Sequence, residues 1–212
     1  MERVEKSRGG WRWGMLGGVR ELGKRYGRVI LWTLLVLALT AAAETAMGRL
    51  PLGPGGRFGW WEWDVWSSEN SQRVADPYSF SHIIHGILFF ALLWWGARRM
   101  PLRRRFLIAL LLEAGWEVLE NSPIIIDRYR EATIAIGYVG DSVLNSCCDV
   151  VMMVIGFLFA WRMRPWASVA AVAAMEVACL FWVRDNLTLN VIMLVHPVEA
   201  IKAWQSAGHP MP

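Results

Sequence analysis

The stretch VILWTLLVLALTAAAETAM, residues 29–47, decides the class of fold to which this chain belongs. Its single charged residue, Glu44, lies near the distal end of the stretch. Because an α-helix rises about 1.5 Å per residue, a helix of this length crosses most of a hydrocarbon core about 30 Å thick. The stretch therefore predicts a transmembrane helix. Its small-residue tail also resembles a signal-peptide cleavage region, but the long basic leader before it favours an uncleaved helix.

Four further stretches have the character of membrane spans, at residues 80–97, 106–120, 142–161 and 166–183. Another apolar stretch, residues 187–195, is too short to cross and is followed by Pro197, which indicates a re-entrant or interfacial helix. The predicted fold is all-α: a polytopic membrane helix bundle with about five transmembrane helices. One integral membrane domain at residues 29–204 is expected between a basic leader at 1–28, predicted to be disordered, and a tail at 205–212.

The composition supports a membrane protein over a soluble one. Hydrophobic residues make up 55% of the chain and charged residues only 19%, against roughly 25% charged in ordinary globular chains. The 14 tryptophans suit helix ends at a lipid headgroup boundary. The net charge of +4 comes from short basic clusters between apolar runs, which argues against a nucleic-acid partner. All three cysteines fall in apolar segments, so no disulfide framework is expected.

The distribution of Lys and Arg predicts the orientation of the chain. Residues 1–28 carry eight of them, the loop between the second and third spans carries five, and the turn after the fourth span carries two. Loops rich in Lys and Arg stay on the cytoplasmic side. We therefore expect a multi-pass protein of a bacterial-type inner membrane, with the N-terminus in the cytoplasm and the C-terminus outside. The lipid bilayer is then its first partner.

Ionisable residues inside the predicted spans require an explanation, because each costs about 2.5–3.5 kcal/mol on insertion. Three groups occur at helical spacing near the outer ends of the second, third and fourth spans: His82 and His85; Glu113, Glu117 and Glu120; and Asp141, Asn145 and Asp149. Spacings of three and four place each group on one helix face. The sequence therefore predicts one polar layer, in which His85, Glu113, Glu117 and Asp149 are the candidate catalytic residues.

The other members of this layer are candidate ligand-binding residues, and each has a structural alternative. Asp141 suits an N-cap for the fourth span, and Asn145 suits a hydrogen bond between helices. Glu120 could be a solvated helix end and His82 an interfacial residue. A histidine with several carboxylates could also hold a divalent metal, although no spacing here selects one. Glu176, near the middle of the fifth span, has no predicted partner.

Three arginines on the outer side are candidate anion-binding residues. Arg128 and Arg130 lie in the loop after the third span, and Arg184 follows the fifth. Guanidinium groups bind phosphate and carboxylate bidentately, so an anionic lipid headgroup is a candidate ligand. The alternative for Arg184 is a local ion pair and helix cap within the Arg184-Asp185-Asn186 string. The cluster SSENS at residues 67–71 is expected to form turns.

Several strings resemble an uncharacterised family of bacterial multi-pass inner-membrane proteins, uncharacterised protein family 0314 or domain of unknown function 2585. They are SSENSQ (67–72), ADPYSFSHIIHG (75–86), EAGWEVLENSPIIIDRYREAT (113–133), GDSVLNS (140–146) and RDNLTLNVIML (184–194). The family has no assigned activity, so the resemblance implies an inner-membrane location and no chemistry. A fainter architectural likeness to VanZ-like membrane proteins involves His85, Glu117, the Asp141 and Asn145 pair, and Gly156.

Three functions remain open from the sequence. The favoured one is a protein without catalytic activity, whose polar layer binds a lipid headgroup or a partner protein, because no spacing matches a known catalytic motif. The alternative is a membrane enzyme that acts on a lipid-linked or anionic headgroup substrate by His/Glu acid-base or metal-assisted chemistry. A transporter is disfavoured, since nearly all ionisable groups lie on one side of the membrane.

Overall fold

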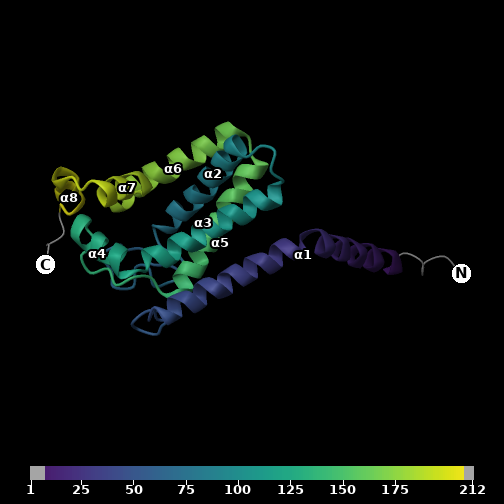
Figure 1. The fold of residues 1–212 in the computed structure, drawn as a ribbon, viewed down its shortest axis with the longest axis horizontal. Helices are drawn as coiled ribbons and strands as arrows, with labels where there is room; N and C mark the ends of the chain where they lie inside the picture. The colour runs from purple at the N-terminus through teal and green to yellow at the C-terminus, as the bar shows by residue number, and fades with distance from the viewer. Residues whose placement is uncertain (1–7, 208–212) are drawn as a thin grey trace, which may run out of the picture.

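The computed structural model describes residues 8–207, with side chains described from residue 27 onward. In this range it contains eight helices and no β-strand: α1 (Arg8–Ala46), α2 (Ser79–Gly96), α3 (Leu102–Glu120), α4 (Pro123–Ala132), α5 (Val143–Arg162), α6 (Pro165–Val183), α7 (Leu187–Val195) and α8 (Glu199–Gln205). Figure 1 shows the long helices α2, α3, α5 and α6 side by side, with the latter part of α1 alongside. The all-α prediction is confirmed.

Among the described residues, four helices are long and apolar enough to cross a membrane: α1 over Gly27–Ala46, α2, α5 and α6. The remaining long helix, α3, has 19 residues, but basic residues at its start and glutamates in its distal half lower its hydropathy. It packs against α1, α2 and α5. The predicted polytopic bundle is therefore present. Helix α3 belongs to it because of its contacts with the other helices, and not because of its composition.

Two helices were not predicted, and one helix begins earlier than expected. The region expected to be a polar loop contains α4, whose Pro123 occupies the first turn, where a missing N–H costs nothing. Its buried residues Ile126, Tyr129 and Ala132 are three apart, a pattern easily missed in ten residues. Helix α8 was also missed, whereas α7 has the predicted bounds. The α1 backbone is helical from Arg8, well before the predicted start at residue 29, and residues 1–7 lie outside the described residues.

Two glycines allow α2 and α5 to cross with their backbones in contact. A Cβ on Gly86 would lie 2.0 Å from the carbonyl oxygen of Met153, and one on Gly156 would lie 2.0 Å from the carbonyl oxygen of Ile83. Small residues at a membrane helix crossing let the backbones approach closely and gain dispersion contacts. This crossing sets the position of the residues one turn away, which include His82 on α2.

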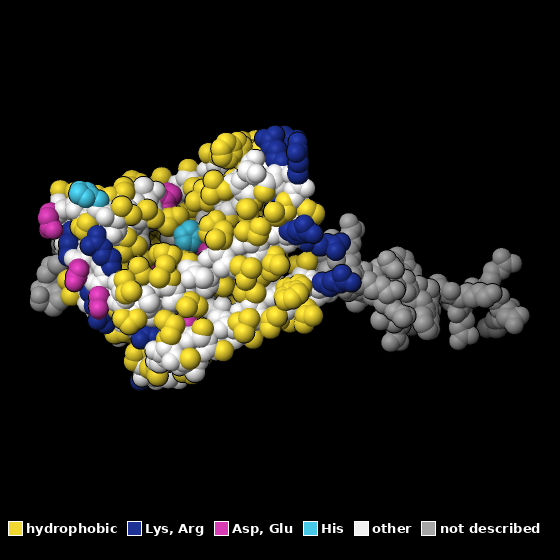
Figure 2. Space-filling view, viewed as in Figure 1, with side chains coloured by type: hydrophobic (Ala, Val, Ile, Leu, Met, Phe, Trp, Pro, Cys, Tyr) yellow, Lys and Arg dark blue, Asp and Glu magenta, His cyan; other side chains and the backbone are white. Residues whose placement is uncertain are grey.

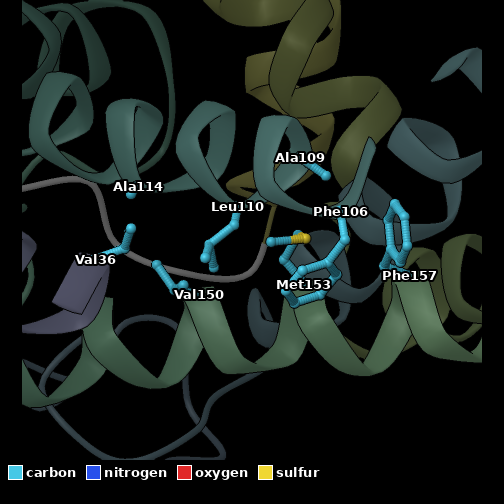
Figure 3. Packing of buried hydrophobic residues seen from close by; sticks show 8 residues of the cluster. All are labelled: Val36, Phe106, Ala109, Leu110, Ala114, Val150, Met153 and Phe157. Atoms are coloured by element: carbon cyan, nitrogen blue, oxygen red, sulfur yellow. The ribbon is translucent and has the colours of Figure 1, made fainter. Parts of the chain in front are cut away.

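An apolar core lies between α1, α3 and α5. Figure 3 shows its side chains: Val36, Phe106, Ala109, Leu110, Ala114, Val150, Met153 and Phe157. The outward faces of the long helices are also apolar, with Leu34, Leu92 and Phe181 among the exposed side chains. Figure 2 shows hydrophobic atoms over most of this face. A bundle that is apolar both inside and outside suits a lipid environment.

The two ends of the bundle differ in composition. The end formed by the α2–α3 and α5–α6 turns carries arginines and no carboxylate: Arg98, Arg99, Arg103, Arg104, Arg105, Arg162 and Arg164. Figure 2 shows groups of Lys and Arg side chains at this end of the bundle, where no Asp or Glu side chain is visible. The opposite end carries α4, α7, α8 and residues 47–78, together with the histidines and carboxylates of α2, α3 and α5. The candidate site is therefore confined to one end.

Candidate functional site

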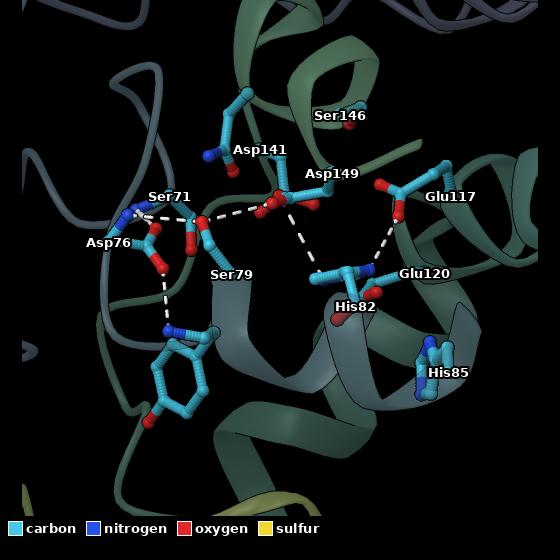
Figure 4. Close-up of polar contacts among 12 residues, drawn as sticks. Ser71, Asp76, Ser79, His82, His85, Glu117, Glu120, Asp141, Ser146 and Asp149 are labelled. Atoms are coloured by element: carbon cyan, nitrogen blue, oxygen red, sulfur yellow. Dashed lines mark hydrogen bonds and ion pairs between the residues drawn. The ribbon is translucent and has the colours of Figure 1, made fainter. Parts of the chain in front are cut away.

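The imidazoles of α2 meet the glutamates of α3 in the buried interior of the bundle. The Nδ1 atom of His82 lies 2.7 Å from Oε1 of Glu113 and 3.2 Å from Oε1 of Glu117. The Nδ1 atom of His85 lies 3.2 Å from each carboxylate oxygen of Glu113. Figure 4 shows His82, His85 and Glu117 close together. The convergence expected from the helical spacing is present, while the roles of these residues stay predictions.

Asp149 of α5 completes this cluster on the other side of His82. Its Oδ2 atom lies 3.8 Å from Nε2 of His82, and its Oδ1 atom accepts a hydrogen bond of 3.1 Å from the Ser79 hydroxyl. Ser79 in turn accepts a bond from the backbone N–H of Asp76. The two carboxylate oxygens of Asp76 accept bonds from the backbone N–H groups of Ser71 and Tyr78. Together these bonds hold the start of α2 against α5.

Asp76 and Ser79 were missed as site residues by the sequence reasoning. Burial raises the pKa of the Asp76 carboxyl, although its backbone hydrogen bonds oppose this. The only signal in the sequence was the string ADPYSFSH, where Asp76 stands three residues before Ser79 at the start of a span. That spacing also fits an ordinary helix-capping turn, so it did not single out a site.

Glu117 differs from its neighbours because its burial is not compensated by hydrogen bonds. It is fully buried, and neither of its carboxylate oxygens has a hydrogen-bond partner in the described part of the structure. Its closest polar contact is Nδ1 of His82, which lies closer to Glu113. A buried carboxylate whose one contact is shared with a neighbour is costly to ionise, so a proton or a cation at this position would lower that cost.

A second group of polar contacts joins the end of α3 to the start of α5. The side chain of Asn121 donates to Oδ2 of Asp141 and to the Ser146 hydroxyl, and it accepts from the backbone N–H of Asp141. The Tyr138 hydroxyl donates to Oδ1 of Asp141 over 2.9 Å. Burial raises the pKa of Asp141 to about 6 against these bonds. This carboxyl is thus held inside the protein and not in solvent.

Three structural alternatives for the polar layer are wrong. Ser142, and not Asp141, caps α5, since its hydroxyl accepts from the backbone N–H of Asn145. The Asn145 side chain donates to the backbone carbonyl of Arg73, so it binds a loop and not another helix. Glu120 accepts a 2.8 Å bond from the buried Tyr129 hydroxyl and is not a solvated helix end.

A cavity of about 350 Å³ opens beside this cluster. Its polar wall contains the following side chains: Asp76, Tyr78, His82, His85, Glu120, Tyr129, Tyr138, Asp141, Asn145 and Asp149. Its apolar wall comes from α2, α3 and α7: Phe89, Leu112, Trp116, Leu187, Val191 and Leu194. No Lys or Arg of the described chain lines it. The cavity is therefore amphipathic, with an acidic polar wall; Glu113 and Glu117 lie behind His82 and His85.

The three candidate anion-binding arginines do not line the cavity and instead bind backbone carbonyls. The Nε atom of Arg128 donates to Leu194 at 2.8 Å, and that of Arg130 donates to Tyr138 at 2.6 Å. Arg184 donates to the carbonyls of Trp204 and Ala207. These bonds tie α4 to the end of α7 and to the loop that follows α4, and they tie the end of α6 to the end of α8 and the residues after it. The arginines thus hold together the segments at this end of the bundle, and Arg130 also pairs with Asp127 of α4.

The segment after α6 is partly as predicted. Asn186 caps α7, because its side chain accepts from the backbone N–H of Leu189, which confirms the predicted cap. The predicted ion pair between Arg184 and Asp185 is wrong: Asp185 instead accepts bonds from Tyr78 and Gln205. The partner missing for Glu176 is also found. Its carboxylate accepts from the first backbone N–H groups of α7, a position favoured by the helix dipole. The predicted turns at residues 67–71 are confirmed.

Comparison with known proteins gives a family without an assigned activity. The family model described as "Protein of unknown function (DUF2585)" matches residues 44–207. A UPF0314 protein of Sphingopyxis alaskensis is 50% identical over 194 residues, covering 92% of this chain and 100% of that relative. UPF0314 proteins of Rhizobium johnstonii and Paracoccus denitrificans are 52% and 47% identical, covering 80% and 82% of this chain and 87% and 91% of their own lengths. No solved structure matches the chain.

Proposed function

The chain belongs to the DUF2585 family, and from that premise we propose that it is an integral protein of the bacterial inner membrane whose outer cavity binds the headgroup of a membrane lipid. The observation that carries the proposal is the amphipathic lining of that cavity. Family membership confirms the resemblance found in the sequence strings. The fainter likeness to VanZ-like proteins stays a prediction.

The apolar wall of the cavity suits the upper part of an acyl chain. Leu112 of α3 and Val191 of α7 line the cavity and are also about half exposed on the surface of the bundle, at 51% and 49%. They therefore connect the cavity with the face that the bilayer covers. A lipid could place its headgroup against the polar wall while its chains stay beside α3 and α7, so neither part would lose a favourable environment.

The charge of the polar wall favours a headgroup that carries an amine. Four carboxylates line the cavity, those of Asp76, Glu120, Asp141 and Asp149. The arginines that suggested an anionic headgroup bind backbone carbonyls elsewhere. An ammonium group offers three donors and a positive charge to acceptor-only carboxylates. We therefore propose an amine-bearing phospholipid as the ligand, in place of the anionic headgroup expected from the sequence.

The orientation in the proposal rests on the two ends of the bundle. The arginine-rich end, with the α2–α3 and α5–α6 turns, belongs on the cytoplasmic side by the positive-inside rule. The cavity lies at the opposite end and so faces the outer leaflet. Five spans, counting α3, then place the segment after α6 outside the cell membrane.

The test is native mass spectrometry of the full chain released from bilayers that contain equal amounts of phosphatidylethanolamine and phosphatidylglycerol. We expect the wild type to retain one phosphatidylethanolamine per chain. Asp141→Asn keeps an acceptor for Tyr138 but removes the charge, and should lower retention on the order of tenfold, the loss expected for one charge-assisted hydrogen bond. Asp127→Asn, an exposed carboxylate outside the cavity, is the matched control. Retention of both lipids in equal amounts by the wild type would contradict the proposal.

One observation favours catalysis as a second candidate. His85 lines the cavity, and its Nδ1 atom lies 3.2 Å from both oxygens of the buried Glu113 carboxylate, which orients the ring. An imidazole positioned in this way suits general acid-base chemistry on a lipid-linked substrate. Incubation with phospholipid followed by lipid mass spectrometry distinguishes the two functions. If the wild type forms a product and a folded His85→Ala variant does not, the proposed function changes from lipid binding to catalysis.

A further inference from the structure

We propose that His82, His85 and Glu113 bind one divalent transition-metal ion, of the Zn²⁺ class, behind the polar wall of the cavity, with the Glu117 carboxylate beside His82. The first support is the ligand set. Two imidazoles and one carboxylate are a combination found in catalytic zinc sites, and imidazole nitrogen favours first-row transition metals over Mg²⁺ or Ca²⁺. One ligand atom from each of the three residues lies within 4.8 Å of the others.

The separations between the ligand atoms are those that a metal ion requires. Bonds of about 2.0–2.2 Å to a common ion place neighbouring ligand atoms roughly 3 Å apart. The Nδ1 atom of His82 lies 2.7 Å from Oε1 of Glu113 and 3.2 Å from Oε1 of Glu117. The Nδ1 atom of His85 lies 3.2 Å from the Glu113 oxygens. An ion can therefore replace the contact between these atoms after small side-chain movements.

The charge of the cluster supplies an independent argument. Every ion pair of Glu113, Glu117 and Asp149 in the described chain is with an imidazole. These three carboxylates are all buried, and if all three are ionised, two imidazoles cannot balance their charge without a bound proton or a cation. A divalent cation would supply the missing charge at this depth, where an uncompensated carboxylate is costly.

Glu117 points to the same ligand. Both of its oxygens are buried and lack a hydrogen-bond partner in the described residues. Figure 4 shows its carboxylate directed at His82. Its one contact, from Oε1 to Nδ1 of His82 at 3.2 Å, is shared with Glu113, which lies closer to the same nitrogen. Coordination to a cation beside His82 would give this carboxylate a partner of its own. A purely structural carboxylate would be expected to find a donor, as Asp149 does in Ser79.

The surroundings of His82 match those of a metal-bound histidine. If Nδ1 binds the ion, Nε2 carries the proton and faces Oδ2 of Asp149 at 3.8 Å. A carboxylate hydrogen-bonded to the far nitrogen fixes the tautomer and orientation of a ligating imidazole; at 3.8 Å Asp149 is an ion-pair neighbour of Nε2 and would have to move closer to provide that support. Asp149 is held in place by the Ser79 hydroxyl. The hydrogen bond from Asp76 to Ser79 and the one from Ser79 to Asp149 therefore hold the Asp149 carboxylate next to the proposed metal ligand His82.

The test is the binding of Zn²⁺ alone to the purified full chain, stripped with a chelator and measured by titration calorimetry and elemental analysis. We expect one Zn²⁺ per chain in the wild type, and at least a tenfold loss of affinity in His85→Ala and in Glu113→Gln. His196→Ala, an exposed histidine after α7, is the matched control and should bind Zn²⁺ as the wild type does. Absence of stoichiometric Zn²⁺ binding to the wild type would overturn the proposal.

Two further variants separate this site from loss of folding and from lipid binding. His85→Cys, which supplies a thiolate in place of the imidazole, should restore Zn²⁺ binding relative to His85→Ala. Asp141→Asn, which should weaken lipid retention, should leave Zn²⁺ binding unchanged, so the two proposals can fail separately. Equal loss of Zn²⁺ in His85→Ala and His196→Ala, with both variants folded by circular dichroism, would show binding outside the cluster and contradict the site.

Discussion

At the residue scale, the buried carboxylates of this protein differ in the hydrogen bonds that compensate their burial. Asp185 accepts from Asn186, Tyr78 and Gln205, whereas both oxygens of Glu117 and of Glu44 lack a hydrogen-bond partner in the described structure. A carboxylate with several donors can remain ionised as a structural group, and one without them requires neutralisation. Asp185 is therefore a residue of the fold, and Glu117 a candidate for chemistry.

The pH dependence of stability should show the structural role of Asp185. Burial raises the pKa of this carboxyl from 3.8 to about 6. The folded state then binds the proton more tightly than the unfolded chain, so this contribution is full at low pH and is lost as the pH rises through about 6. Asp185→Asn cannot ionise and keeps an acceptor oxygen. Above this pKa we expect its free energy of unfolding to exceed that of the wild type, by up to about 3 kcal/mol.

Thermal unfolding in detergent between about pH 4 and pH 8, below and above the folded-state pKa, measures this difference. The gap between Asp185→Asn and the wild type should shrink toward zero at the acidic end. Asp127→Asn, whose side chain is 65% exposed, is the control and should follow the wild type throughout. A difference that is constant with pH, or that grows toward low pH, would show that the hydrogen bonds of Asp185 outweigh the cost of its ionisation.

At the element scale, the crossing of α2 and α5 determines whether the site forms. Gly86 and Gly156 permit backbone contact at this crossing, and His82 and Asp149 face each other near it. An added side chain at the crossing would separate the helices and lengthen the distance from Nε2 of His82 to Asp149. The geometry of the site therefore depends on Gly86 and Gly156, although neither has a polar side chain.

Gly156→Ala should destabilise the protein because its Cβ would lie 2.0 Å from the carbonyl oxygen of Ile83, which is backbone and cannot rotate away. Overpacking of a helix interface costs about 1–3 kcal/mol, and a backbone clash belongs at the upper end of that range. Gly115→Ala in α3 is the control, since no atom lies within 4 Å of its added Cβ. That variant should be neutral or more stable by up to about 1 kcal/mol, from helix propensity. Melting temperatures of both variants in detergent decide the comparison, and equal effects would contradict close packing at Gly156.

The long helices could be predicted from the sequence because lipid removes the competition between local and tertiary preferences. A continuous apolar run of the length of residues 166–183 crosses a bilayer as a helix, because its backbone groups then bond within the run, and α6 has nearly these bounds. The short helices α4 and α8 lie outside the apolar runs, so no such rule applied to them. The residue types also could not decide between Asp141 and Ser142 as the N-cap of α5, because aspartate and serine are both good N-cap residues.

At the scale of the whole molecule, helical spacing predicted which residues meet but not what surrounds them. His82, His85, Glu113, Glu117 and Asp149 lie on faces that an antiparallel bundle must bring together. The cavity, in contrast, depends on α7 folding back over the site, which Glu176 and the backbone contacts of Arg128 position. Those contacts join segments far apart in the sequence, so periodicity carries no information about them. The sequence therefore could not show that Arg128, Arg130 and Arg184, which were expected to bind a ligand, bind backbone carbonyls instead.

The orientation of the molecule gives the last prediction, since it decides which leaflet the cavity faces. In a variant whose three native cysteines are replaced by alanine, single cysteines can be placed at exposed positions of the two ends: Glu131 of α4, and Arg99 of the α2–α3 turn. A membrane-impermeant maleimide should label Glu131→Cys in intact spheroplasts and Arg99→Cys only after permeabilisation, because arginine-rich loops stay in the cytoplasm. Arg164→Cys, in the second arginine-bearing turn, should behave as Arg99→Cys does. The reverse pattern would move the cavity to the cytoplasmic leaflet, while the convergence of His82, Glu113 and Asp149 would remain unaffected, since that depends on helix packing alone.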